Sequence, residues 1–254
     1  MTARDGKDPD LRRSVTLLWA GRPEGQRGPR RRLTVEDIAQ AAVRIADADG
    51  LEALSMQRIA AELGYSTMAL YNHIPNKDLL LEVAADLGAG PPPDLDTTDH
   101  RQAVRGWVDA LWSGFRRRPW ILRVPLDHAP MGPHQLAWLE RLLRALLAAG
   151  LVGSEARAAA LHLTAVVRGA AQISLNTAST DDGLLRSEAD VEQLVAEYID
   201  PESFPALTAV QAAESASGQR NREPADGLPF ELSFGVDRFL DGIESWVADQ
   251  KRQS

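Results

Sequence analysis

Apolar residues recur at intervals of three or four along most of the chain after residue 33, which is the spacing of an amphipathic helix. The first such stretch begins at Thr34, where Asp37 can complete a capping box three residues later, and it ends at Gly50. No stretch shows the strict alternation that a half-buried strand requires. The pattern therefore predicts an all-α protein.

Two short helices joined by a tight turn are predicted within residues 54–77. Gly64 can adopt the left-handed backbone conformation that ends a helix, and Ser66 is a favourable N-cap for the helix that follows over 67–73. Asn76 then caps a further helix. The residues spaced to face one shared core are Leu54, Ile59, Leu63, Leu70 and Ile74. This arrangement is a helix-turn-helix, which can present one helix to the DNA major groove but also occurs as an ordinary helical hairpin.

The outward face of the second helix carries hydroxyl, imidazole and methyl groups, which suit contacts with phosphates and thymine methyls. The residues on this face are Thr67, Met68, Ala69, Tyr71 and His73. A run of arginines precedes the first helix, namely Arg27, Arg30, Arg31 and Arg32. Such a run is either a solvated tail or an arm that contacts phosphates or the minor groove, and its position before the helix-turn-helix favours the arm.

Residues 33–88 resemble the DNA-binding domain of the TetR family of bacterial transcriptional regulators. The motifs that carry the resemblance are DADGLEALSM, IAAELG and MALYNHIPNKDLL. The resemblance implies that 67–73 is the recognition helix and that Gln57 reaches a base or a phosphate. It also implies contacts with the DNA backbone from Tyr71, His73 and Lys77. The full set of expected DNA-binding residues is Arg30, Arg31, Arg32, Thr34, Gln57, Ser66, Thr67, Met68, Ala69, Tyr71, His73 and Lys77.

The rest of the chain consists of further helices and irregular segments. Residues 1–32 are rich in Arg, Gly and Pro and are expected to be mostly disordered, with one helical turn at 17–19. The segment GAGPPPDLD ends the helix that starts at Lys77 and marks a domain boundary. Further helices are predicted over 98–118, 119–124, 133–149, 154–176, 187–199 and 228–249, with a loose loop at 212–227. The chain thus divides into a basic arm at 1–32, a DNA-binding domain at 33–90 and a helical ligand-binding and dimerisation domain at 91–254.

Composition and charge narrow the function. The chain has 254 residues, of which 44% are hydrophobic and 25% charged, with no cysteine and no apolar run long enough to cross a membrane. Its first residues lack the apolar core of a secretory signal, so we expect a cytoplasmic protein. The formal net charge is −8, but it is unevenly distributed along the chain. Residues 1–77 carry 12 basic and 10 acidic side chains and are therefore net positive. DNA binding needs only a local positive surface, so the acidic total does not exclude it.

The sequence carries no nucleophile elbow, phosphate-binding loop or dinucleotide fingerprint. His128 and His134 are separated by Pro130, Gly132 and Pro133 among other residues, which is not a zinc-ligand spacing. We therefore expect no enzymatic activity, no cofactor and no metal site.

A polar ridge interrupts the apolar helix predicted at 154–176. Its residues repeat every four positions and are Thr164, Arg168, Gln172 and Asn176. Polar groups on so apolar a helix must meet water, a partner or a ligand. Three interpretations stay open, namely the rim of a dimer interface, the wall of a ligand pocket and a plain solvent face.

The C-terminal part resembles, less specifically, the ligand-binding domain of the tetracycline-repressor branch of the TetR family, through RRRPWILRV, GPHQLAWLERLLRALLAAGL and LTAVVRGAAQ. This resemblance implies a homodimer interface from 154–177 and 228–249. It also implies a pocket lined from 79–87, 104–115, 120–138 and 161–175. The candidate ligand-binding residues are Trp107, Trp112, Trp120, Trp138, Arg168 and Gln172. The magnesium–drug chelate of tetracycline repressors is not carried over, because the residues around His128 depart from that motif.

The sequence as a whole predicts a DNA-binding transcriptional regulator. It is expected to act as a homodimeric repressor that a small apolar or aromatic effector releases from a palindromic operator in double-stranded DNA, with no membrane partner. Two other classes stay open. One is a ligand-independent DNA-binding activator. The other is a helical small-molecule-binding protein or enzyme that has the shape of a helix-turn-helix but does not bind DNA. Failure to bind DNA at low salt would favour the last class.

Overall fold

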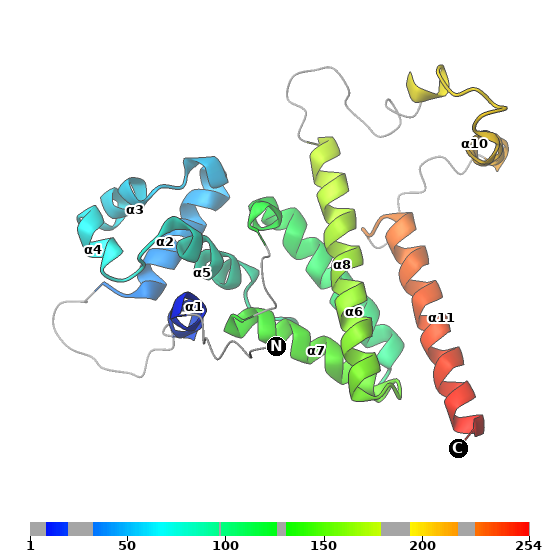
Figure 1. Ribbon diagram of the computed structural model, residues 1–254, viewed down its shortest axis with the longest axis horizontal. Coiled ribbons are helices and arrows are strands. Elements are labelled where there is room, and N and C mark those ends of the chain that lie inside the picture. Colours follow the sequence, from blue (N-terminus) through cyan, green and yellow to red (C-terminus); the bar gives the residue numbers. More distant parts are fainter. Residues whose placement is uncertain are drawn as a thin grey trace, which may run out of the picture. The chain divides into compact units, whose positions relative to one another are not determined.

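The computed structural model describes residues 9–19, 33–96, 98–125, 131–178, 194–217 and 227–253, and the regular elements in these ranges are helices (Figure 1). The first are α1 (Pro9–Trp19), α2 (Val35–Asp49), η1 (Leu51–Ala53), α3 (Met56–Leu63), α4 (Thr67–Tyr71) and α5 (Lys77–Ala89), where η marks a 3-10 helix. The others are α6 (His100–Arg117), η2 (Pro119–Arg123), α7 (Pro133–Ala148), α8 (Gly153–Ala178), α10 (Pro205–Ser217) and α11 (Phe230–Gln253). The all-α prediction is confirmed.

Contacts within the chain divide it into two compact units, residues 1–160 and 161–254. The first unit holds α1 to α7 with the first turns of α8. The second holds the rest of α8, together with α10 and α11. The segment predicted to bind DNA, 33–90, therefore lies wholly within the first unit.

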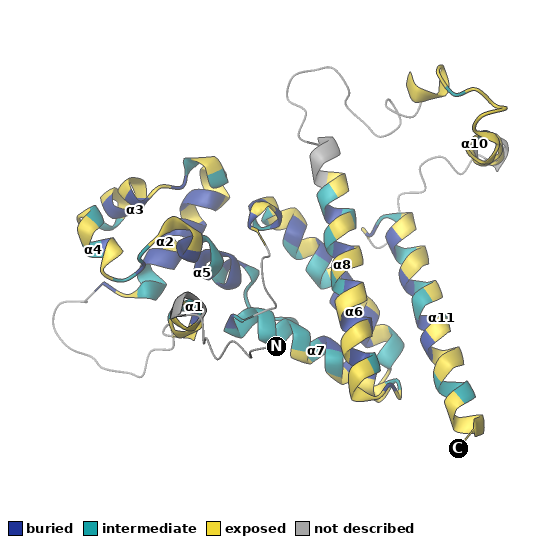
Figure 2. Ribbon diagram, viewed as in Figure 1, coloured by how far each residue is buried: buried dark blue, intermediate teal, exposed yellow. Residues whose placement is uncertain are grey.

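The helices α2 and α5 form the centre of the core that carries the helix-turn-helix. They pack against each other, α3 and η1 pack on α2, and α1 and η2 pack on α5. Buried residues run along both central helices in Figure 2. The predicted core residues that are almost fully buried are Leu54, Ile59, Leu70 and Ile74, while Leu63 packs half-buried at the edge of this core. The core prediction is thus confirmed apart from the partial exposure of Leu63.

Side-chain caps fix where the two central helices begin. The Thr34 hydroxyl accepts a hydrogen bond from the backbone N–H of Asp37 at 3.0 Å, and the Asp37 carboxylate accepts from the backbone N–H of Thr34 at 3.1 Å. This is the predicted capping box. At α5, the Asn76 side-chain oxygen accepts from the backbone N–H of Leu79 at 2.8 Å. Both caps satisfy backbone donors that have no partner inside their own helix.

The sequence predicts that residues 1–32 are mostly disordered with one helical turn at 17–19, and the structure describes residues 9–19 of this segment as α1. The helical turn is confirmed, but the helix extends further toward the N-terminus than predicted. Leu18 of α1 is buried in the core beside α5. The indole N–H of Trp19 donates to the backbone carbonyl of Met131 at 2.9 Å. The sequence did not reveal the full length of this helix because its buried face is narrow and its supporting contacts come from distant residues.

The predicted loop at 212–227 is wrong for its first residues, because α10 continues to Ser217. This helix begins at Pro205, whose fixed φ suits a first helical turn, and its sequence is rich in alanine. Small residues that suggested a loop are here helix formers. Of the helix predicted over 187–199, the structure describes residues 194–199, and 194–196 are helical.

In the second unit, α8 and α11 lie side by side, and the rings of His162 and Phe239 stack with their centroids 5.1 Å apart (Figure 1). Buried side chains form one stripe on each helix, consisting of Leu163, Val167 and Ala171 on α8 and Leu232, Val236, Leu240 and Ile243 on α11. Large apolar side chains also stay exposed, with Leu161 at 73% and Ile173 at 64% on α8. Among the described helices, none has the length and apolar character needed to cross a membrane.

Candidate DNA-binding site

The turn between α3 and α4 has the geometry that the sequence predicts. Gly64 takes a φ of 73° and a ψ of 29°, which is the left-handed region that a residue with a side chain rarely adopts. This conformation lets the backbone N–H of Tyr65 donate to the carbonyl oxygen of Ala60 at 2.9 Å, which closes the end of α3. Ala60 is buried, so its small side chain allows α3 to pack closely at this point.

The short helix α4 exposes one face and buries the other. The Ser66 hydroxyl accepts from the backbone N–H of Ala69 at 3.2 Å, which fixes the first turn of α4. Leu70 is fully buried, while Met68 is 68% exposed and Tyr71 is 44% exposed. The exposed face of α4 thus carries two side chains available for contact with DNA. Met68 is apolar, and Tyr71 can form hydrogen bonds.

The other predicted DNA-binding residues differ in exposure. Those that are exposed are Thr34, Gln57, Ser66 and Lys77. Thr67 and His73 are half-buried, and His73 lies beyond the end of α4, which is two residues shorter than predicted. Ala69 is half-buried and packs against the core, so less of its methyl group is available than the helix pattern suggested. Arg30, Arg31 and Arg32 lie outside the described residues.

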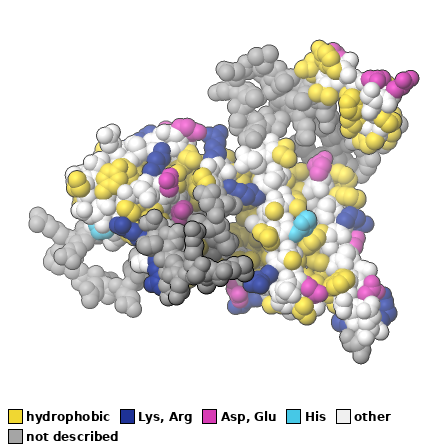
Figure 3. All heavy atoms as spheres, in the orientation of Figure 1, with side chains coloured by type: hydrophobic (Ala, Val, Ile, Leu, Met, Phe, Trp, Pro, Cys, Tyr) yellow, Lys and Arg dark blue, Asp and Glu magenta, His cyan; other side chains and the backbone are white. Residues whose placement is uncertain are grey.

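Residues 33–89 supply little positive charge for phosphate binding, since they contain three basic and nine acidic side chains. Arg44 forms an ion pair with Glu62 at 2.8 Å, and Arg58 forms one with Asp49. Lys77 forms no ion pair within the described part of the chain, and it stands at the first position of α5. On the face seen in Figure 3, Lys and Arg side chains are scattered rather than gathered into one patch. Within this segment, Lys77 is therefore the cation best placed to meet a phosphate.

The other end of α5 is tied to α7 through Asp86. Asp86 is only 3% exposed, and its carboxylate accepts from the backbone N–H groups of Gln135 at 2.9 Å and His134 at 3.3 Å. The imidazole Nδ1 of His134 lies 3.1 Å from the same carboxylate. This hydrogen bond raises the pKa of His134 above its usual value, against the opposing effect of desolvation. A side chain of α5 thus caps α7, whose own N-cap residue, Gly132, has no side chain to do so.

A second tie joins α2 and α5 to the segment after α6. The guanidinium of Arg118 lies against both carboxylate oxygens of Asp47, at 3.1 and 3.0 Å, and donates to the backbone carbonyl of Gly88 at 2.7 Å. The indole N–H of Trp120 donates to Asp47 at 2.7 Å. Gly88 leaves just enough room for the Trp120 ring, since a Cβ there would lie 3.0 Å from two ring carbons. The end of α5 is thus held from two sides.

The four tryptophans predicted to bind a ligand have different surroundings. Trp120 belongs to the core around α2 and α5. Trp107 is buried on α6 and donates to the backbone carbonyl of Trp138 at 3.0 Å, and the two rings meet edge to face at 5.9 Å. Trp138 is half-buried and donates to the carbonyl of Gly90 at 2.9 Å. Trp112 is also buried on α6, but its indole nitrogen has no partner in the described part of the molecule.

The polar ridge of α8 is half-buried at Thr164, Arg168 and Gln172, and the side chain of Asn176 lies outside the described residues. Each of these three described residues has an interaction partner. Burial lowers the pKa of the Arg168 guanidinium. Partial burial argues against the interpretation of this ridge as a plain solvent face.

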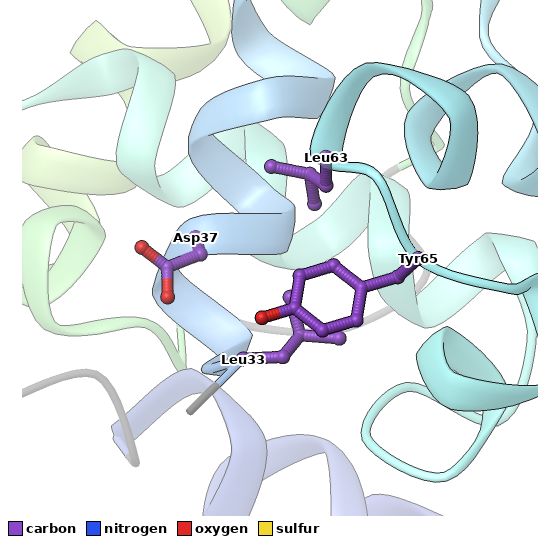
Figure 4. Close-up of a pocket in the computed structure, with 4 residues that line it drawn as sticks. All are labelled: Leu33, Asp37, Leu63 and Tyr65. Atoms are coloured by element: carbon purple, nitrogen blue, oxygen red, sulfur yellow. The ribbon is translucent and has the colours of Figure 1, made fainter. Parts of the chain in front are cut away.

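A small cavity lies beside the helix-turn-helix, lined by Leu33, Asp37, Leu63 and Tyr65 (Figure 4). Its volume of about 180 Å³ is below the ~300–1,000 Å³ of sites for drug-sized ligands. The Asp37 carboxylate on its wall already holds the cap of α2. This cavity is therefore smaller than the usual site for a drug-sized effector.

Sequence reasoning missed Asp86 as a functional residue, although the sequence holds a signal for it. Asp86 stands three residues after Val83 and seven after Leu79, on the buried face of α5. A carboxylate at such a position needs a partner, and a helix that starts with Gly132 and a proline needs a cap from elsewhere. The carboxylate and the uncapped helix can satisfy each other, but only the fold brings Asp86 into contact with the start of α7.

The helix-turn-helix, its capped short second helix and the further helices that follow it define a DNA-binding protein of the bacterial regulator class. The family model "Bacterial regulatory proteins, tetR family" matches residues 38–84, and "Tetracyclin repressor-like, C-terminal domain" matches residues 92–247. The chain belongs to the TetR family. It is a DNA-binding transcriptional repressor and not an enzyme, as the sequence predicted.

Individual relatives agree with this assignment. The chain is 32% identical over 256 aligned positions to the HTH-type transcriptional repressor DrrR1 of Streptomyces coeruleorubidus, covering 96% of this chain and 90% of the relative. The structure of apo ActR from Streptomyces coelicolor is similar with a TM-score of 0.68 and 25% identity, covering 87% of this chain and 99% of ActR. ActR in complex with actinorhodin is similar with a TM-score of 0.65 and 27% identity, covering 83% and 95%.

Proposed function

We propose that this repressor is a homodimer that a planar, largely apolar effector releases from a palindromic operator. The observation that carries the proposal is the position of α5, which bears Lys77 at one end and is bound to α7 and η2 at the other. One rigid helix thus links the predicted DNA contacts to the helices predicted to hold the ligand. The similarity to ActR, whose structure contains actinorhodin in one complex, supports an aromatic effector.

The proposed DNA contacts divide into two groups. Gln57 can pair with an adenine, and Thr67, Met68 and Ala69 can meet thymine methyls, so these side chains would read the base sequence. The residues proposed to bind phosphates are Arg30, Arg31, Arg32, Thr34, Ser66, Tyr71, His73 and Lys77. The arginines carry particular weight, because the folded segment has few cations that are not ion-paired.

The proposed release mechanism is a movement of α5. An effector between the middle helices would shift α7 or the segment that begins at Arg118 and continues into η2. The start of α7 is bonded to α5 through Asp86, and Arg118 is bonded to α5 through Gly88. Trp120 of η2 also donates to Asp47 of α2, which packs on α5. A shift of α5 would move the helix-turn-helix packed beside it and change the separation of the two recognition helices from the ~34–36 Å that one turn of DNA requires. Coupling of this kind is typically worth about 1–3 kcal/mol.

The proposed dimer uses 154–177 and 228–249. Exposed apolar side chains on α8 and α11 support this assignment, because they would otherwise stay in water. They include Leu161, Val166 and Ile173 on α8 and Phe230, Phe234 and Trp246 on α11. The predicted ligand-binding residues Arg168 and Gln172 also lie on α8. The proposal places them either in the ligand pocket or at the rim of the dimer interface.

The test combines DNA selection with a release assay on the full-length protein. Genomic fragments retained by the protein should share an inverted repeat, and sedimentation at micromolar concentration should show a species of twice the chain mass. Actinorhodin and further planar aromatic compounds are then titrated against the bound DNA. A monomer that selects a single half-site would overturn the dimer. Stable DNA complexes in the presence of compounds that demonstrably bind would overturn release by an effector.

A further inference from the structure

The indole of Trp112 differs from the other described tryptophans of the first unit in one respect. Trp19, Trp107, Trp120 and Trp138 each donate their indole N–H to an oxygen of the protein, at distances between 2.7 and 3.0 Å. Trp112 is only 3% exposed, and its Nε1 finds no acceptor among the described residues. The difference is not one of burial, because Trp107 and Trp120 are equally enclosed and are both hydrogen-bonded.

A buried donor without a partner is rare and unfavourable. More than nine in ten buried polar groups in folded proteins have a hydrogen-bond partner, and an exception calls for an explanation such as an absent ligand or water. A phenylalanine at this position would fill an apolar site without this penalty. An indole at this position therefore calls for an acceptor that the described residues do not supply, and a bound ligand is one that would meet the N–H group.

The helix that carries Trp112 restricts what this acceptor can be. Val108 and Phe115 lie one turn before and one turn after it on the same buried face of α6, and both are apolar. An occupant next to this face must be largely apolar and must carry at least one oxygen or nitrogen lone pair. A ketone or quinone oxygen on a planar aromatic body meets both requirements. A pure hydrocarbon does not, because it leaves the N–H unpaired.

We propose that the Trp112 indole N–H is the donor that binds and orients the effector, through a carbonyl-type oxygen on a planar aromatic ring system. This inference rests on the proposed release by an effector and specifies the chemistry of that effector. It also separates the four tryptophans by role. Trp107, Trp120 and Trp138 use their N–H groups to hold the fold together, and Trp112 keeps its own for the ligand.

The test compares two soluble probes of nearly the same shape, anthraquinone-2-sulfonate and anthracene-2-sulfonate, on the full-length protein by calorimetry. The wild type should bind the quinone about tenfold more tightly, since one buried hydrogen bond contributes about that factor. Trp112→Phe should lose this preference through weaker quinone binding, while its anthracene affinity stays unchanged. Trp19→Phe is the matched control, because it also removes an indole N–H from the first unit but lies outside the expected ligand-binding residues, and it should keep the preference. Nearly equal wild-type affinities for the two probes, or no binding of either, would overturn the inference.

A DNA-release assay with the same probes separates this inference from the proposed function. If the quinone preference depends on Trp112 but operator DNA stays bound, the hydrogen bond is real and release by the effector is wrong. If both probes release DNA at equal concentrations, release stands and the role of Trp112 is wrong. A crystal structure in which an internal water occupies the Trp112 N–H in the presence of bound quinone would also overturn it.

Discussion

Asp86→Asn is the substitution that most directly tests the link between α5 and α7. The change keeps the size of the side chain but removes the charge and one of its two acceptor oxygens. Both oxygens are in use, since Oδ1 accepts from the backbone N–H of Gln135 and Oδ2 lies against the N–H and the ring of His134. An asparagine must therefore leave a donor of α7 unpaired and place its own NH₂ group against it.

The size of the effect follows from these contacts. Hydrogen bonds to a charged group contribute about 1.5–3 kcal/mol, and a buried donor left unpaired costs about 1–3 kcal/mol. The bond to His134 N–H is long at 3.3 Å, so we count one strong bond, to Gln135 at 2.9 Å, and expect a loss of about 2 kcal/mol. For a domain of this size that loss lowers Tm by roughly 4–8 °C. Asp94→Asn is the matched control, because the Asp94 side chain is 96% exposed in its ion pair with Arg141 and should change Tm little.

The pH dependence of this loss has a defined sign. The Asp86 carboxylate raises the pKa of His134 above 6.5, its unperturbed value, so the folded state binds a proton more tightly than the unfolded state. The stabilisation by the charged pair is fully present below pH 6.5 and is lost as the pH rises through the raised pKa. The difference between wild type and Asp86→Asn should therefore be larger at about pH 5.5 than at about pH 9. His134→Gln should remove this pH dependence while leaving the backbone cap of α7 in place.

Thermal unfolding followed by circular dichroism across this pH range measures both effects. Release of operator DNA by a bound effector should also weaken in Asp86→Asn, because α7 then grips α5 less firmly. Equal Tm values for the variant and the wild type at all pH values would refute the assigned role of Asp86. A loss of stability without the pH dependence would confine that role to the backbone cap.

Three further substitutions test single features of the structure. Gly132→Ala would place a Cβ within the carboxylate of Asp86, so it should lower the free energy of unfolding by about 1–3 kcal/mol, measured by urea denaturation. Gly64→Ala has free space around it but a φ of 73°, so it should cost about 1 kcal/mol through backbone strain alone, and a neutral result would contradict the left-handed turn. Lys77→Ala should weaken binding to all DNA sequences alike and reduce the slope of log affinity against log salt by about one, whereas a changed sequence preference would contradict a phosphate contact.

The sequence by itself determined the local elements of the DNA-binding domain. Thr34, Gly64, Ser66 and Asn76 act on backbone groups within a few residues of themselves, so their roles follow from their neighbours in the chain. The apolar spacing around Leu70 fixed which face of α4 is buried for the same reason. These short-range rules were enough to predict a helix-turn-helix and, with the motifs that resemble the TetR family, its class.

Only the tertiary structure decided the features that depend on residues far apart in the chain. The helix at 9–19 persists because Leu18 and Trp19 find partners in the core and at Met131. Asp86 becomes a link because the fold brings the uncapped start of α7 to the buried face of α5. Its bonding partner Gln135 lies 49 residues further along the chain. The tryptophans looked equivalent in the sequence, and burial alone does not distinguish Trp107 from Trp112. What separates them is whether an acceptor lies within about 3 Å of each indole nitrogen, and that is set by packing that no local pattern encodes.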